Sequence, residues 1–249
     1  MLVALLVAGC DRVPRMGFPN AITPQGREIL GLWKGSWIAA ALVGAFVWGL
    51  MLWAGFVYRR RKDTDIVPDQ VRYNLPIELL YTAVPLVVVA FLFVYTARTE
   101  TYVDKLSANP PVKIGVVGFQ WNWQFNYLDK GVQITGRPGT PAQLVIPSNR
   151  KIRFIESSPD VNHSFFVPSF LFKRDVIPGR QNQFEITVEK EGTYVGRCAE
   201  FCGVDHDRMN FSVRVVSPQE YDAFLAKSAA GSASAAGGSP VSPTPGSSS

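Results

Sequence analysis

The stretch that decides the architecture reads WIAAALVGAFVWGLMLWAGFVY and runs from Trp37 to Tyr58. It contains no charged residue, and it is long enough to cross the hydrocarbon layer of a membrane as an α-helix. Its tryptophans and its terminal tyrosine suit the two membrane–water interfaces. We therefore predict a first transmembrane helix here. A buried helix of a soluble protein is the alternative, but charge-free runs of this length are rare in soluble cores.

A second apolar run, LLYTAVPLVVVAFLFVYTA, extends from Leu79 to Ala97. Its one proline, Pro85, is compatible with a membrane helix, because membrane helices tolerate proline better than soluble ones. The two runs together predict a helix hairpin over residues 36–98, with residues 59–76 as the loop between the helices.

The one cluster of basic residues in the chain lies in that loop. RRRK, Arg59 to Lys62, directly follows the first run, and Arg72 lies before the second. The positive-inside rule makes this loop cytoplasmic, so both ends of the chain face outward. Basic residues also precede the first helix, so charge alone does not decide the orientation. The remaining basic residues are scattered and the formal net charge is only +5, which gives little support to nucleic-acid binding.

The N-terminal sequence MLVALLVAGC resembles the end of a bacterial lipoprotein signal peptide. In such proteins the chain is cut before a cysteine that becomes lipidated, and here that cysteine is Cys10. The stretch lacks a positively charged start, so an ordinary apolar N-terminus is the alternative. We expect residues 1–9 to be a signal remnant, Cys10 to carry a lipid anchor, residues 10–35 to be extracytoplasmic, and the protein to lie in a bacterial plasma membrane.

Beyond Ala97 the pattern changes to short runs of alternating apolar and polar residues, which predict strands from Val112 to about Ser217. Turn sequences such as RPGTP and IPGRQN separate the runs. Many short strands at this spacing indicate an all-β Greek-key sandwich or barrel, which we place at residues 99–227. SPQEYDAFLAK predicts a short helix that begins near Ser217. Residues 228–249 contain mainly Ser, Ala, Gly and Pro and are expected to be disordered.

One segment of this domain concentrates groups that bind metals. RCAEFCGVDHDRM contains Cys198, Cys202, His206 and Met209, and the other histidine of the chain, His163, stands in DVNHSFFVP. The two cysteines could form a disulfide in an oxidising compartment. The cysteines and histidines could instead bind zinc, which leaves the methionine without a role. Copper accounts for all five side chains, because thiolate and thioether are soft ligands and imidazole is the usual nitrogen donor. We rank copper first, the disulfide second and zinc third. Two thiolates can bridge two metals, which accounts for the second cysteine.

These motifs resemble subunit II of the cytochrome c oxidases. The resemblance rests on DVNHSFFVPSFLFKRDVIPGRQN followed by GRCAEFCGVDHDRM, on the aromatic stretch GFQWNWQFNY, and on PIELLYTAVP at the start of the second helix. It covers roughly Trp37 to Leu225. SFLFKRD, together with the box before Cys10, is most similar to the actinobacterial members.

The resemblance implies a cupredoxin barrel that holds a binuclear, mixed-valence copper centre called CuA. Both cysteines would bridge the two coppers, and each copper would receive one histidine and one weaker ligand. The carboxylate of Glu200 would reach a magnesium ion at the boundary with subunit I. The implied copper ligands are His163, Cys198, the backbone carbonyl of Glu200, Cys202, His206 and Met209.

Two further residues have roles in the family. Trp121 matches the tryptophan where electrons enter from cytochrome c, whereas Phe119, Trp123 and Phe125 around it are expected in the core. Glu78 matches the carboxylate at the mouth of a proton pathway, as an ionisable group in a membrane helix suggests. A carboxylate that stabilises the start of the helix is the alternative for Glu78.

The implied function is that of subunit II of a haem–copper cytochrome c oxidase. It would accept electrons from cytochrome c and pass them to subunit I, where oxygen reduction is coupled to proton pumping. The implied partners are subunits I and III and a membrane-bound cytochrome c of an attached cytochrome bc complex. A quinol oxidase subunit lacks the copper ligands, and a membrane-anchored copper carrier needs neither Glu78 nor Trp121.

Overall fold

The structure is a computed structural model that describes residues 13–59, 70–137 and 139–236, with side chains up to residue 230. The prediction for Cys10 and residues 1–9 lies outside the described residues, as do most of the loop after the first helix and the last thirteen residues of the tail. The chain divides into two compact units. Of the described residues, the first unit comprises 13–20, 27–59 and 70–104, and the second, which we call the β-domain, comprises 21–26, 105–137 and 139–236.

The first unit contains the two predicted apolar helices, α2 (Pro24–Val57) and α3 (Leu75–Val103), after a short 3-10 turn, η1 (Val13–Arg15). Their most apolar windows have mean hydropathies of 2.0 and 2.4, and no residue in these windows is buried within the protein. α2 begins thirteen residues before its apolar run, at Pro24, and α3 extends beyond both ends of its run. α3 begins where the side chain of Asn74 accepts a hydrogen bond from the Ile77 N–H (3.4 Å).

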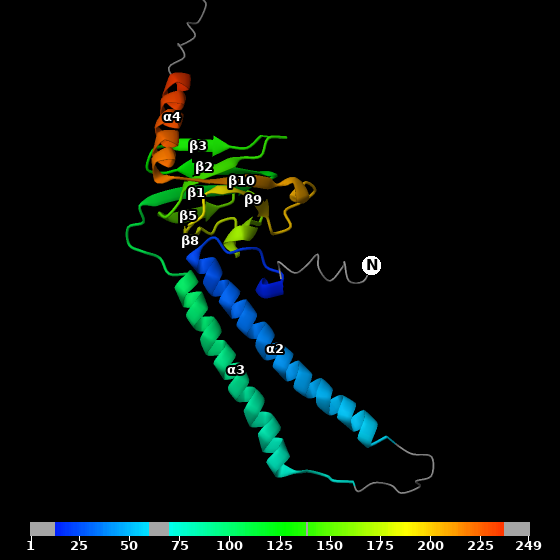
Figure 1. Cartoon of the computed structure of the whole chain (residues 1–249). Coiled ribbons are helices and arrows are strands. Elements are labelled where there is room, and N and C mark those ends of the chain that lie inside the picture. The colour runs from blue at the N-terminus through cyan, green and yellow to red at the C-terminus, as the bar shows by residue number, and fades with distance from the viewer. Residues whose placement is uncertain (1–12, 60–69, 138, 237–249) are drawn as a thin grey trace, which may run out of the picture. The chain divides into compact units, whose positions relative to one another are not determined.

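The β-domain consists of two five-stranded sheets, with strand orders β3-β2-β1-β5-β8 and β4-β10-β9-β6-β7 (Figure 1). β1 pairs parallel with β5, and β4 pairs parallel with β10, while the other pairs are antiparallel. The predicted all-β sandwich is therefore confirmed. The strands are β1 (Val112–Phe119), β2 (Asn122–Tyr127), β3 (Val132–Thr135), β4 (Gln143–Pro147), β5 (Lys151–Ser157), β6 (His163–Val167), β7 (Phe172–Val176), β8 (Asn182–Thr187), β9 (Gly192–Cys198) and β10 (Asn210–Val216).

The core lies between the sheets because most strands alternate buried and half-buried residues. Along β1 and β2 the buried positions follow the period of two that the sequence predicted. Trp123 and Phe125 are fully buried, as predicted, and they pack edge-to-face against Phe211. Phe119 was expected in the core as well but is half-buried, because it falls on the outward face of β1.

Residues 21–26, which lie just before α2 and in its first turn, also belong to the β-domain. The Ile22 N–H donates to the carbonyl of Ser169 (3.2 Å), and the Glu189 N–H donates to the carbonyl of Ile22 (3.0 Å). The side chain of Ile22 joins the hydrophobic core, and Thr23 is fully buried. The predicted domain, residues 99–227, lacked this segment, because a single isoleucine in a polar stretch gives no periodic signal.

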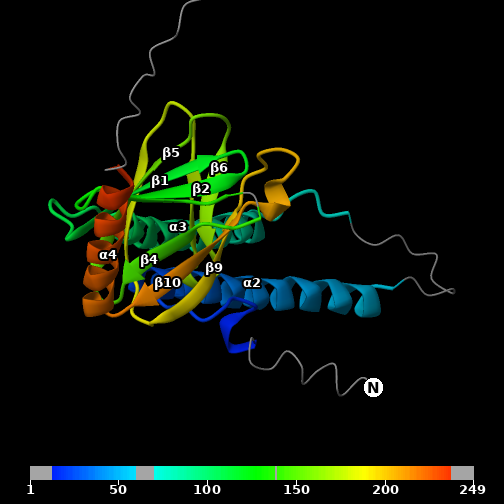
Figure 2. The same cartoon turned by 90° about the horizontal axis from the view of Figure 1, so that it is seen from above.

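The C-terminal helix α4 (Pro218–Ala236) packs against β3 (Figure 1) and β4 (Figure 2). The Glu220 N–H donates to Ser217 Oγ (3.2 Å) at its start, as predicted, and Tyr221 and Leu225 are buried. The helix continues through residues 228–236, for which the prediction of disorder was wrong. Alanine, the strongest helix former, is frequent in this stretch and extends a helix already anchored by its first turns.

Candidate metal centre

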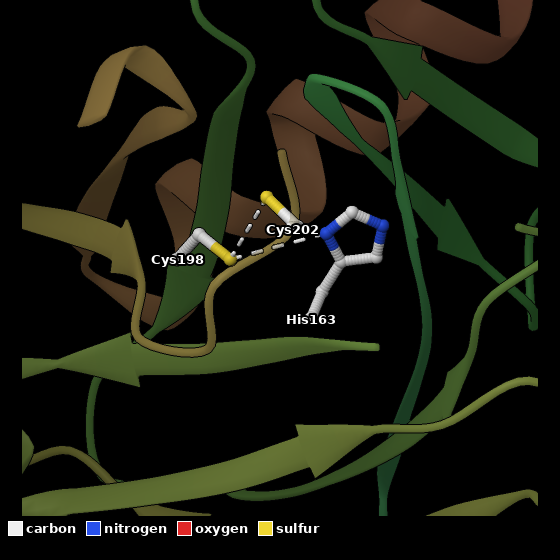
Figure 3. Close-up of side chains that lie close together, drawn as sticks. All are labelled: His163, Cys198 and Cys202. Atoms are coloured by element: carbon white, nitrogen blue, oxygen red, sulfur yellow. Dashed lines mark hydrogen bonds between the residues drawn. The ribbon is translucent and has the colours of Figure 1, made fainter. Parts of the chain in front are cut away.

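The predicted metal-binding residues come from two places in the chain that the second sheet brings together. Cys198 is the last residue of β9, and the next segment carries Cys202, the 3-10 turn η3 (His206–Arg208) and Met209. His163 is the first residue of β6, which pairs with β9 so that Phe165 lies opposite Cys198. This pairing places His163 beside the cysteines (Figure 3).

The predicted donor atoms converge. Cys198 Sγ lies 3.8 Å from Cys202 Sγ and 3.9 Å from His163 Nδ1. Cys202 Sγ lies 3.5 Å from His206 Nδ1 and 3.7 Å from Met209 Sδ. The carbonyl oxygen of Glu200 is 3.2 Å from Cys198 Sγ. We call these six groups the ligand cluster. The two thiols are free and their sulfurs are far beyond the length of a disulfide bond, about 2.05 Å.

Most of the ligand cluster is shielded from water. His163 is fully buried, Cys198, Cys202 and Met209 are buried, and His206 is half-buried. The imidazole of His163 is oriented by Asp160, whose Oδ1 lies 2.9 Å from Nε2, so that Nδ1 faces the sulfurs. A carboxylate in this position fixes the ring of a metal-binding histidine. Gly118 makes room for the ring, because a Cβ there would lie 3.3 Å from the ring atom His163 Cδ2.

The two thiols differ in acidity. Burial raises the pKa of Cys198, but hydrogen bonds to His163 and to the backbone near Glu200 outweigh it and lower the pKa to about 7. Burial and the neighbouring Cys198 raise the pKa of Cys202 to about 12. One thiolate is therefore available near neutral pH, whereas Cys202 must lose its proton to a metal as the metal binds.

Trp121 contacts the ligand segment directly. Its indole Nε1–H donates to the carbonyl of Cys202 (3.1 Å), and Gln120 Nε2 donates to the same oxygen (2.8 Å). Gly203, with φ +123°, allows this approach, because a Cβ there would lie 3.1 Å from the indole. The backbone N–H of Gln120 also donates to Asp160 Oδ2 (2.7 Å). Asp160 thus contacts both His163 and the segment that carries Trp121.

Two further predicted site residues are Glu200 and Glu78. Glu200 contributes its carbonyl to the cluster and is half-exposed. Glu78 lies in the first unit, where its Oε1 accepts a hydrogen bond from the Asn74 N–H (2.9 Å). That contact stabilises the start of α3, which is the alternative role considered for this residue. The sequence offered no signal for the positions of Gln120 and Gly118, because their roles depend on contacts between distant loops.

The donor set fits copper. Two thiols and one thioether are soft ligands, two imidazoles are intermediate, and the one carbonyl is the single hard ligand, whereas oxygen-seeking cations such as magnesium prefer sites built from oxygen atoms. Zinc would leave the thioether of Met209 unused. Fold and site together define a protein with two apolar helices and a cupredoxin-like domain that carries a buried, sulfur-rich metal centre.

The chain belongs to the cytochrome c oxidase subunit II family. The family model of the subunit II transmembrane domain matches residues 12–98, and that of the periplasmic domain matches residues 139–216. The probable cytochrome c oxidase subunit 2 of Streptomyces coelicolor is 44% identical, over 90% of this chain and 83% of the relative. Cytochrome c oxidase subunit 2 of Mycobacterium tuberculosis is 34% identical, over 90% and 78%. These relatives confirm the resemblance to the actinobacterial members.

Among solved structures, the periplasmic domain of subunit II of the Bradyrhizobium japonicum cytochrome oxidase matches with 29% identity and a TM-score of 0.46. The match covers 49% of this chain and 96% of that domain. Membership of the family makes this chain a subunit of an oxidoreductase complex of the plasma membrane. Its two helices span the membrane, and its β-domain lies on the extracytoplasmic side.

Proposed function

We propose that the β-domain accepts electrons from cytochrome c at a binuclear CuA centre and passes them to subunit I, where oxygen is reduced and protons are pumped. The observation that supports this most directly is the convergence of four other donor groups on two buried cysteine sulfurs 3.8 Å apart. A mononuclear site would leave one of these thiols without a role.

In this proposal Cys198 and Cys202 would both hold the two metals. His163 and Met209 complete the first copper site, and His206 and the Glu200 carbonyl complete the second. When bound, two coppers that share two thiolates supply reversible one-electron transfer with little change in bond lengths. The protein contributes rigidity, because Asp160 holds His163 and the paired strands β6 and β9 hold the cysteines in both oxidation states.

Metal analysis and spectroscopy of the full chain test this function. Loaded with copper, the protein should bind two ions per chain, turn purple, and show the electron paramagnetic resonance of a delocalised mixed-valence pair. One copper per chain, or zinc alone, would exclude the binuclear centre.

For the electron donor we propose a membrane-bound cytochrome c of an attached cytochrome bc complex, which meets the protein near Trp121. The surface there carries mixed charge: a cavity of about 480 Å³ beside Trp121 is lined by Arg137, Asp205 and Arg208 among others. Such a surface gives little electrostatic steering to a soluble, highly charged partner, and a tethered donor needs none. Turnover with the native donor complex should depend weakly on ionic strength. Fast, steeply salt-dependent oxidation of a soluble cytochrome c would contradict this.

The ligand segment also offers a surface for the oxidase subunits. Phe201 and Val204 are 78% and 81% exposed, and exposed apolar side chains beside a functional site commonly mark an interface. We assign this surface to contact with subunit I, where the carboxylate of Glu200 would bind magnesium. When manganese is supplied in place of this magnesium, Glu200→Gln should lower the manganese content of the assembled oxidase. Subunit III completes the proposed complex.

Two proposals concern the membrane-bound part. Glu78 is assigned to the mouth of a proton pathway, and Glu78→Gln should slow oxygen reduction in the oxidase while the copper spectrum is unchanged. Cys10 is assigned as the lipidated residue, so the mature chain from membranes should begin at Cys10 with added acyl mass. An unmodified Cys10 in a chain that retains Met1 would contradict the second proposal.

A further inference from the structure

Glu156 is a buried carboxyl group that the proposed electron transfer does not use. It lies on the inward face of β5, after the core residues Ile152 and Phe154, and is fully buried. Among the residues that the structure describes, neither carboxylate oxygen has a hydrogen-bond partner. An ionised carboxylate is poorly tolerated in such a place, and each buried polar group without a partner requires a physical explanation.

Among the described residues, two charged groups of the protein act most on Glu156, and both are on β7. Arg174 favours the ionised form and Asp175 opposes it, and Asp175 Oδ1 is itself buried without a hydrogen-bond partner among the described residues. The neighbouring strands place Val116 and Asn182 beside Glu156, and the Asn182 amide already donates to the backbone carbonyl of Asp175 (2.6 Å). Burial outweighs the attraction of Arg174, so the pKa of Glu156 is raised well above its ordinary value.

We propose that Glu156 is a proton-binding site in the core of the β-domain, which holds a proton at neutral pH and exchanges it with solvent as the charge of the ligand cluster changes. The neutral acid removes the cost of a buried charge. The protonated carboxyl group also supplies an O–H donor near Asp175, whose Oδ1 is buried without a partner among the described residues.

Two sets of contacts lie between Glu156 and His163, one further along the chain and one on the paired strand β1. Two residues further along the chain, Ser158 Oγ donates to Asp160 Oδ1 (3.1 Å), and the same oxygen lies 2.9 Å from His163 Nε2. On the paired strand β1, Gly118 follows Val116 by two residues and packs against His163. Residues two apart on one strand face are separated by roughly 7 Å. Charges in a poorly hydrated interior interact appreciably over one or two such steps.

The coupling rests on the proposed copper function and has a definite direction. Adding one electron to the ligand cluster makes its surroundings more negative and strengthens proton binding at Glu156. The fraction of Glu156 that is ionised before reduction then takes up a proton from solvent, so less than one proton is bound on average for each electron that cytochrome c supplies. Glu156 releases that proton when the electron leaves for subunit I.

Infrared spectroscopy of the metal-free full chain tests the proton itself. At neutral pH the wild type should show the carbonyl stretch of a protonated carboxylic acid, Glu156→Gln should lack it, and the control Glu185→Gln should keep it. Glu185 is the matched control because it is also buried, but Arg153 holds it ionised. Should Glu156→Gln fail to fold, Asp175→Asn provides a second test: loss of its negative charge should move the titration of the band to lower pH. A wild type without the band, or a band that remains in Glu156→Gln, would overturn the proposal.

The midpoint potential of the copper-loaded oxidase, measured against pH, tests the coupling. The potential should fall with rising pH in the wild type and in Glu185→Gln, and it should be independent of pH in Glu156→Gln. Equal pH dependence in all three proteins would overturn the coupling. If the wild type fails to bind two coppers, the proposed function fails, but the infrared result still decides whether Glu156 holds a proton.

Discussion

Two buried polar clusters of the β-domain satisfy their charged and polar atoms in different ways. On the outer face of the first sheet, Glu185 is 3% exposed, and the protein itself supplies the cations: Arg153 at 2.6 Å and Lys151 at 3.7 Å. Ser107 donates two further hydrogen bonds to this carboxylate. In the ligand cluster, by contrast, sulfur, imidazole and carbonyl atoms approach one another at 3.2–3.9 Å.

The difference shows how a structural ion pair is distinguished from a metal site. A carboxylate that is paired with an arginine already has its charge neutralised, and binding a metal there would require breaking that ion pair. Lone pairs that converge on one another are stabilised most by a cation from outside the chain. The comparison therefore predicts that mutations in the ligand cluster change metal binding and electron transfer, while mutations around Glu185 change stability alone.

The largest expected effect is the loss of either bridging thiolate. Cys198→Ser or Cys202→Ser in the full chain should abolish the mixed-valence signal in electron paramagnetic resonance, because a hydroxyl cannot replace a bridging thiolate. Cys10→Ser is the matched control and should keep the signal. A mixed-valence signal that persists in either ligand mutant would remove the distinction between the two clusters.

Next in size is the expected effect of Trp121→Ala on electron transfer. The indole donates to the carbonyl of Cys202, so its removal takes away the direct contact between the donor side and the ligand segment. Electron uptake from the donor complex should slow by at least about tenfold, as for other losses of positioning. The copper content and spectrum should remain as in the wild type. Loss of copper in this variant would show that Trp121 supports the cluster and does not serve electron transfer.

The sequence predicted the helices, the sandwich and the ligand residues better than it predicted the residues that support them. The length of the two charge-free runs was sufficient to predict the two helices. The alternation of apolar and polar residues was sufficient to predict the β-sandwich. The ligand residues were predictable from residue type and spacing, because few sites require two thiols, two imidazoles and a thioether together. Gly118 and Asp160 support His163 only because β1 and the loop before β6 meet, and no local pattern reports such a contact. The same holds for Ile22, which joins a core whose other residues lie far along the chain.

The Glu185 cluster should affect stability and leave the metal centre intact. Glu185→Gln removes the charge that Arg153, Lys151 and Ser107 surround, and we expect a loss of about 2–3 kcal/mol in the free energy of unfolding. Thermal unfolding of the full chain in detergent measures this. The exposed pair Arg214–Glu220 provides the control, since Glu220→Gln should change stability by less than about 1 kcal/mol.

The stabilisation by Glu185 should depend on pH in one direction. Burial raises the pKa of this carboxyl, but the hydrogen bonds from Arg153 and Ser107 outweigh burial and hold the pKa below its ordinary value. The stabilisation is therefore present above the ordinary pKa of glutamate and is lost as the pH falls through the lowered value. The difference between wild type and Glu185→Gln should be constant around neutral pH and shrink in acid. A difference that grows towards acid would contradict the ion-pair assignment.

The smallest expected effect within the ligand cluster belongs to Met209. Its Sδ lies 3.7 Å from Cys202 Sγ and its side chain is buried, so Met209→Leu keeps the packing volume and removes only the thioether. A thioether is a weak, long ligand that mainly adjusts the potential of a copper site held by thiolate and imidazole. The variant should bind two coppers and keep the mixed-valence signal, with a shifted midpoint potential. Complete loss of copper, as expected for Cys202→Ser, would mean that the thioether holds the metal as strongly as the thiolates do, and the assumed order of ligand strengths would be wrong.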